Sequence, residues 1–305
     1  MHLHAQNTAP GGAIRRGIAF LQSVALNPEY FAEDGEDLLW CFYTTSTVAA
    51  DPEVRAITGS TARQLALQWS RMHPGVPPDA TVDDLVNLAT GAAAANALGV
   101  RTPGLRSQLR RRARTFTPRD FFAFDPRRGP PGSWDVWCDA LIAAHAGNFF
   151  DVRLGASYRD IVRWLPAMRP YPAHPAGSDE FRSVVYSITH LVYTLNDYGA
   201  YSLDRNCLRP EYEYLVAHLR EMIALRDSET LGEFLDSLRS FGLTSRDPLI
   251  ADGVRFLLST QNADGSWGAP DEKSIYTRYH STWTAIDGLL EYRFRPARGC
   301  PVRRY

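Results

Sequence analysis

The sequence of 305 residues lacks several features that would assign a protein to a class at once. Its four cysteines lie far apart and form no CxxC pair, and no apolar secretory leader precedes them. A disulfide framework is therefore not expected, and the cytoplasm is the expected location. The longest apolar stretch, near Ala92–Val100, is much too short to cross a bilayer. We therefore expect a soluble protein with no membrane span.

The chain also lacks an excess of charge of either sign. Its 33 basic and 34 acidic residues give no indication of a nucleic-acid partner. One basic run, Arg106 to Arg114, holds five arginines. Such a run is typical of the solvated face of a helix, and phosphate binding is the alternative. No feature of the sequence indicates an oligomeric state.

Strand-like alternation of apolar and polar residues is nearly absent, and helical periodicity dominates instead. Proline and glycine fall mostly between the periodic segments. The pattern predicts an all-α chain of about twelve helices in six consecutive pairs. The predicted pairs are 12–25 with 36–50, 59–71 with 82–98, 103–114 with 134–147, 156–166 with 179–198, 210–225 with 229–241, and 248–261 with 274–291.

The second helix of most pairs is more apolar and richer in small residues than the first, as in 91–95 and 140–144. This asymmetry is expected of an inner ring of buried helices wrapped by an outer, half-solvated ring. Six such pairs predict one (α/α)6 barrel domain over residues 1–305, and a solenoid of helix pairs is the alternative. The ends, 1–11 and 293–305, are expected to be frayed.

Two adjacent segments near the end of the chain carry a family resemblance. Residues 256–268 resemble the repeat of squalene–hopene cyclases and other terpenoid cyclases, in which a Gln (here Gln261) ends the outer helix and Asp-Gly-Ser-Trp-Gly follows. Residues 275–289 are similar to the last repeat of protein prenyltransferase β subunits, with Tyr279-His280-Ser281 where that family has Tyr-His-Thr. Both resemblances, clear only over about 255–291, imply an (α/α)6 barrel and an apolar substrate of the isoprenoid or specialised-metabolite kind.

Neither family's catalytic motif transfers completely. Terpenoid cyclases protonate their substrate with an Asp-x-Asp-Asp motif, whose nearest match here is Thr81-Val82-Asp83-Asp84, without the first Asp. Prenyltransferases bind zinc through an Asp-x-Cys pair and the His that His280 matches, but no Asp-x-Cys occurs in this chain. The resemblance therefore implies a fold more directly than a reaction.

A repeated spacing singles out a set of residues on the predicted inner helices. His190 is followed seven residues later by Asp197, and His280 is followed seven residues later by Asp287. Seven residues are two helical turns, so each His and its Asp are expected on one helix face, about 10 Å apart. On the second helix of the third predicted pair, Cys138 is likewise followed seven residues later by His145. If the three helices are in the same register, Cys138, His190 and His280 lie at one height along the inner ring, the first level. His145, Asp197 and Asp287 then lie at a second level.

Two histidines and a cysteine that converge in a cavity are ligands of the kind that hold a catalytic Zn²⁺ or a non-haem Fe²⁺, and an aspartate, here Asp197, is the alternative third ligand. The first level therefore predicts one divalent metal, and the second-level Asp197, Asp287 and His145 are the predicted catalytic groups that orient imidazoles or move protons. The sequence favours a metal-dependent enzyme acting on a small apolar substrate. A metal-free terpenoid cyclase with Asp83, Asp84 or Asp197 as its acid, and a non-enzymatic helical scaffold, are the alternatives.

Overall fold

The computed structural model describes residues 9–297 and 299, and this part of the chain is helical. The elements are α2 (Pro10–Ala25), α3 (Pro28–Val48), α4 (Pro52–Met72), α5 (Val82–Ala97), α6 (Leu105–Ala113), α7 (Pro118–Phe122), α8 (Trp134–Phe149), α9 (Tyr158–Val162), the 3₁₀ helix η1 (Leu165–Met168), α10 (Asp179–Leu195), α11 (Arg209–Leu225), α12 (Ser228–Ser240), α13 (Pro248–Thr260) and α14 (Ile275–Leu289). No strand forms among the described residues, which contain only two isolated β-bridges. The prediction of an all-helical chain is confirmed.

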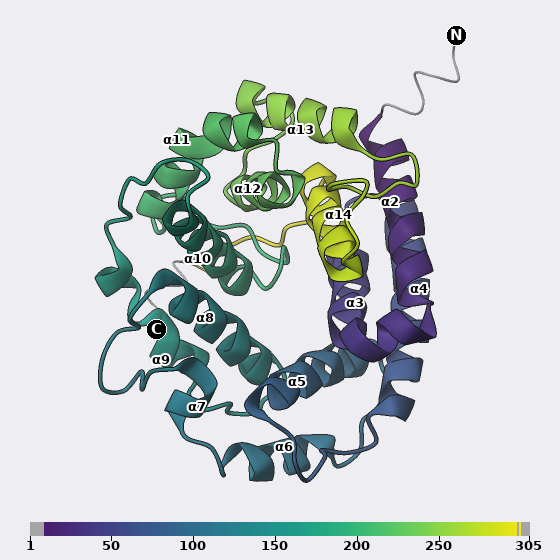
Figure 1. Ribbon diagram of the computed structural model, residues 1–305, viewed down its shortest axis with the longest axis vertical. Helices are drawn as coiled ribbons and strands as arrows, with labels where there is room; N and C mark the ends of the chain where they lie inside the picture. The colour runs from purple at the N-terminus through teal and green to yellow at the C-terminus, as the bar shows by residue number, and fades with distance from the viewer. Residues whose placement is uncertain (1–8, 298, 300–305) are drawn as a thin grey trace.

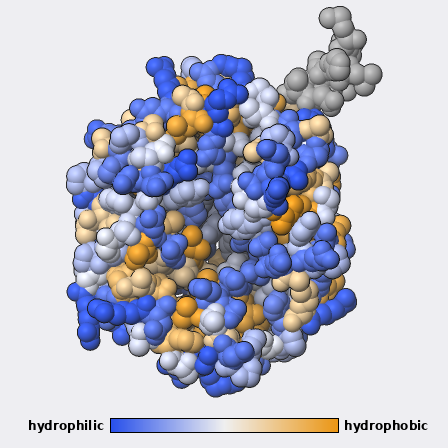
Figure 2. All heavy atoms as spheres, in the orientation of Figure 1, coloured by the Kyte–Doolittle hydropathy of each residue, from blue (hydrophilic) through white to orange (hydrophobic). Residues whose placement is uncertain are grey.

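The helices form an inner ring around the centre of the molecule and an outer layer that surrounds it (Figure 1). The inner helices are α3, α5, α8, α10, α12 and α14; each contacts the next around the ring, and α14 contacts α3. The chain alternates between the layers, because each inner helix follows an outer segment in sequence. Figure 2 shows that the same face of the molecule is hollowed near its centre and has a mostly hydrophilic rim.

The closest contact within the ring is between α12 and α14, and glycine makes it possible. A Cβ atom on Gly232 would lie 2.3 Å from the carbonyl oxygen of Thr284, and one on Gly288 would lie 2.9 Å from the Cα atom of Gly232. Helices α10, α11 and α13 also pack against α12. All of its residues from Thr230 to Ser240 are therefore buried. Because the helix also carries Glu233, Asp236 and Arg239, this packing places charged residue types in the interior.

The turn between α13 and α14 connects the last outer helix to the first. The side-chain amide of Gln261 donates to the carbonyl oxygens of Ala13 and Gly265, both at 2.9 Å. Trp267 is fully buried, and its indole N–H donates to the carbonyl oxygen of Leu257 at 2.8 Å. A Cβ atom on Gly17 of α2 would lie 2.8 Å from the Trp267 ring. This turn therefore closes the outer layer by joining α13 to α2.

The cysteines and the chain ends differ in part from expectation. Cys207 is disulfide-bonded, so the expectation of a chain without disulfides is wrong, whereas Cys41 and Cys138 are buried free thiols. The predicted frayed ends, 1–11 and 293–305, lie partly outside the described residues; within them, α2 begins at Pro10 and Arg295 pairs with Tyr201. No helix in the described part of the chain is long and apolar enough to cross a membrane.

Candidate functional site

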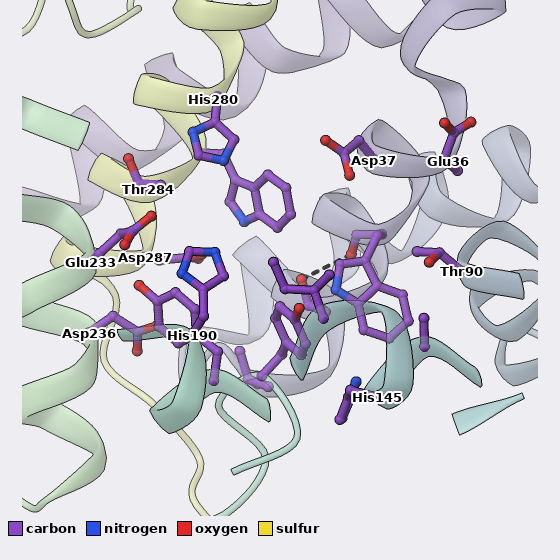
Figure 3. Close-up of a pocket in the computed structure, with 18 of the residues that line it drawn as sticks. Glu36, Asp37, Thr90, His145, His190, Glu233, Asp236, His280, Thr284 and Asp287 are labelled. Carbon is purple, nitrogen blue, oxygen red and sulfur yellow. Dashed lines mark hydrogen bonds between the residues drawn. The ribbon is translucent and has the colours of Figure 1, made fainter. Parts of the chain in front are cut away.

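A cavity of about 210 Å³ lies inside the ring, and all six inner helices contribute side chains to its wall (Figure 3). Five acidic residues (Glu36, Asp37, Glu233, Asp236, Asp287), three histidines (His145, His190, His280) and six large aromatic residues (Trp40, Tyr193, Tyr198, Tyr276, Trp283, Tyr292) line it. No lysine or arginine of the described chain is among the lining residues. The cavity thus combines aromatic walls with carboxyl groups that no lysine or arginine within it balances.

Four of the six residues singled out by the repeated spacing line this cavity: His145, His190, His280 and Asp287. Asp197 does not, because α10 ends at Leu195 and Asp197 follows it in a left-handed conformation with φ 51°. Its carboxylate lies 3.3 Å from Nε2 of His145, in a neighbouring cavity that shares His145 with the central one.

Two of the three predicted metal ligands, His190 and His280, line the cavity. The thiol of Cys138 lies outside the cavity wall, 3.7 Å from the carbonyl oxygen of Tyr186. Burial, with neighbouring carboxyl groups, raises the pKa of the Cys138 thiol well above its usual value. Within the described residues, no three or more His, Cys, Asp or Glu side chains are grouped so as to hold a metal ion. The described side chains therefore do not fit a His-His-Cys centre, and the metal stays a prediction.

The Thr81–Asp84 segment, considered as a remnant acid motif, caps a helix instead. The carboxylate of Asp84 accepts hydrogen bonds from the backbone N–H of Thr81 at 2.7 Å and from its hydroxyl at 2.8 Å. These bonds hold the pKa of Asp84 below its usual value. Asp84 is therefore ionised at the exposed start of α5, and neither it nor Asp83 lines the cavity.

The strongest acid candidates are carboxyl groups of α12 and α14. Burial raises the pKa of Glu233 to about 8, although the hydroxyl of Thr189 donates to its Oε2 at 2.7 Å and favours the ionised form. Burial likewise raises the pKa of Asp236 to about 7. The pKa of Asp287 is raised well above 3.8 by burial and by the nearby charge of Asp236. Near neutral pH, this side of the cavity therefore retains protons that exposed carboxylic acids would have lost.

Two polar atoms in the cavity wall are buried with neither a hydrogen bond nor an ion pair within the described chain: Oδ1 of Asp236 and Nε1 of Trp283. The Trp283 indole is close enough to Asp287 to favour its ionised form, but it does not reach hydrogen-bond geometry. Leaving a buried polar atom unpaired costs about 1–3 kcal/mol. A molecule in the cavity that accepts from Trp283 and pairs with Asp236 would offset that cost.

His190 has the properties of a base facing these acids. Its Nδ1 lies 2.9 Å from the carbonyl oxygen of Tyr186, which can only accept, so Nδ1 carries the proton. Burial lowers the pKa of His190 to about 4, with a smaller contribution from nearby His280. The imidazole is therefore neutral, and its Nε2 has a free lone pair. Figure 3 shows His190 on the same side of the cavity as Glu233 and Asp236.

His280 instead has an acidic partner. Its Nδ1 lies 3.1 Å from Oε1 of Glu229, which also accepts a hydrogen bond from the hydroxyl of Tyr186 at 2.8 Å. Burial alone would lower the pKa of His280, but Glu229 and the neighbouring carboxyl groups raise it overall. His280 therefore holds a proton more readily than His190 does.

Several of these acidic residues were not among the site residues predicted from the sequence. Glu36, for example, has its pKa raised to about 7 by burial. Glu229, Glu233 and Asp236 are spaced four and three residues apart, which places them on one face of α12. This spacing could have identified them from the sequence, because three acidic residues on one face are unusual for a helix otherwise rich in apolar side chains.

No protein-family model, curated protein or solved structure matches this chain. The site is therefore interpreted from its own geometry.

Proposed function

We propose that this protein is an enzyme that transfers protons to and from a small, largely apolar substrate in the central cavity. The observation that carries the proposal is the separation of pKa values on one side of that cavity. Glu233 and Asp236 have pKa values of about 8 and 7, whereas His190, on the adjoining helix, has a pKa of about 4. Carboxylic acids kept protonated beside a neutral imidazole supply a general acid and a general base at the same pH.

We assign Asp236 as the acid, because it lines the cavity and its buried Oδ1 has no hydrogen-bond partner within the described chain. The proton of Asp236 adds to a double bond of the substrate, and Asp287 stabilises the carboxylate that remains by sharing its own proton. Trp40 and Trp283 line the cavity, and their aromatic rings stabilise the cation that develops. Nε2 of His190 then removes a proton from a neighbouring carbon.

The proposed reaction is an isomerisation or cyclisation. The substrate gains one proton and loses one, and solvent returns the proton from His190 to Asp236. The step therefore needs no oxidant and no group donor. It corresponds to the metal-free, terpenoid cyclase-like alternative, with the acid on α12 instead of in an Asp-x-Asp-Asp motif.

We further propose that the fold is an (α/α)6 barrel of the terpenoid-cyclase kind. The alternation of outer and inner helices supports this assignment, as does the turn built on Gln261 and Trp267. The aromatic walls support an unsaturated substrate of the isoprenoid type.

The test is turnover of small linear isoprenoids in D₂O, with deuterium in the product measured by mass spectrometry. Asp236→Asn and His190→Gln should each reduce turnover by about 10²- to 10⁴-fold. Asp252→Asn is the matched control, because this carboxylate is exposed on the outer helix α13, does not line the central cavity and should be dispensable. Full turnover by both cavity variants, or an equal loss in the control, would overturn the assignment.

The metal-dependent alternative is tested on the same protein. Elemental analysis of protein purified without an affinity tag should find no stoichiometric zinc or iron, and turnover should survive treatment with a chelator. Stoichiometric metal that is lost in His280→Ala, together with loss of turnover on chelation, would replace the acid–base proposal with the metal centre.

A further inference from the structure

A second concave site lies in the outer layer, around α6 and the short helix α7 (Figure 1). It has a volume of about 380 Å³, and four arginines line it: Arg110, Arg114, Arg127 and Arg153. No acidic residue of the described chain lines it, and it shares no residue with the central cavity. We call this site the arginine groove.

The arginine groove lies in the most basic part of the chain. Residues 101–128 contain nine arginines and two aspartates, a surplus of seven positive charges in a chain whose net charge is −1. The run from Arg106 to Arg114 is not simply a solvated face. Arg110 and Arg114 line the groove, and Arg112 lies over the ring of Phe116, 4.9 Å from its centre.

Two of the four groove arginines already have acidic partners. Arg110 forms an ion pair with Asp151, and Arg153 forms one with Asp160 at 3.0 Å. These contacts hold two guanidinium groups at the edge of the groove.

The other two have no such partner. The guanidinium groups of Arg114 and Arg127 form no hydrogen bond or ion pair with any described residue. The groove therefore concentrates positive charge that the described chain does not neutralise. Such a site attracts an anion.

We propose that the arginine groove binds the phosphate or diphosphate group of a small molecule. The planar guanidinium fork matches two oxygens of a phosphate, and several forks can share one diphosphate. Phe116, held by Arg112, gives the rest of the ligand an apolar surface.

A small ligand fits better than a nucleic acid. The uncompensated charge lies within one concave site rather than along an extended stripe, and the chain as a whole is slightly acidic. The proposal does not depend on the acid–base reaction of the central cavity, because the two sites share no residue.

The experiment is isothermal titration calorimetry of the full chain with pyrophosphate as the probe, and with sulfate at matched ionic strength. The wild type should bind pyrophosphate saturably and more tightly than sulfate. The double variant Arg114→Gln/Arg127→Gln should bind it about tenfold more weakly or worse, because charge-assisted hydrogen bonds are lost. Arg101→Gln/Arg111→Gln is the matched control: it removes the same charge from exposed positions outside the groove and should change affinity by no more than about twofold.

Circular dichroism melts of each variant establish that it is folded. The proposal is overturned if wild-type protein does not bind pyrophosphate saturably, or if the control pair weakens binding as much as the groove pair does. An oligonucleotide that binds through Arg114 and Arg127 more tightly than pyrophosphate would replace the small-molecule site with a polyanion site.

Discussion

Replacing Glu233 with glutamine should stabilise the protein at alkaline pH and change it little at acidic pH. Glu233 is buried in α12, and burial raises its pKa to about 8 from the 4.5 of an exposed glutamate. Glutamine has the same shape and keeps an oxygen that can accept the hydrogen bond from Thr189. The substitution therefore removes the ionisation and little else.

The direction of the pH dependence follows from the pH at which the folded and the unfolded protein each lose the proton of Glu233. The unfolded carboxyl ionises near pH 4.5 and the folded one near pH 8, so unfolding releases a proton between these values. The stabilisation from this group is fully present below pH 4.5 and is lost as the pH rises through 8. Each pH unit in this window removes up to about 1.4 kcal/mol, or at most about 5 kcal/mol in all.

The assay is unfolding by guanidinium chloride at pH values from about 5 to about 9, with the free energy of unfolding extrapolated to water. The difference between Glu233→Gln and wild type should grow steadily in favour of the variant and level off near pH 8. Glu213→Gln, at an exposed position of α11, controls for the loss of one acidic side chain. A Glu233→Gln difference that stays constant over the whole range would refute the reasoning, because Glu233 would then be ionised in the folded protein.

Two further predictions concern the packing of the helices. Gly232→Ala should destabilise the protein by about 1–3 kcal/mol or more, because the new Cβ would lie 2.3 Å from the carbonyl oxygen of Thr284. In Gly59→Ala, on the outer helix α4, the Cβ would meet nothing closer than 3.6 Å, and the change should gain up to about 1 kcal/mol. Equal unfolding midpoints for these two variants would contradict the close α12–α14 contact. Trp267→Ala should cost about 3–5 kcal/mol in the same assay, and an unchanged midpoint would show that the turn does not join α13 to α2.

The helices were predictable because their periodicity and boundary signals are local. Thr81 and Asp84, for example, form the capping box that starts α5. The short α7 was not predicted, since five residues are too few to show a period, and the predicted helix 156–166 is divided into α9 and η1. α10 ends three residues before its predicted end at 198, because Asn196 accepts from the backbone N–H of Gly199 and donates to Ser240, which draws the chain out of the helix.

The site was predictable only in part, for a physical reason. The His-to-Asp register brought His280 and Asp287 to the cavity, since both lie on one face of an unbroken helix. Glu233 and Asp236 were missed, because acidic residues on a helix usually face solvent. Their burial depends on how α10, α11, α13 and α14 pack around α12, and this is a property of the assembled ring.

The most direct test of the acid–base account is the infrared carboxyl spectrum of the folded protein. We would record it at about pH 6, where exposed carboxylic acids are already ionised. The account predicts a band from protonated carboxyl groups that weakens in Glu233→Gln and again in Asp236→Asn. A wild-type spectrum with carboxylate bands alone at that pH would contradict it, because the cavity would then hold no acid able to protonate a substrate.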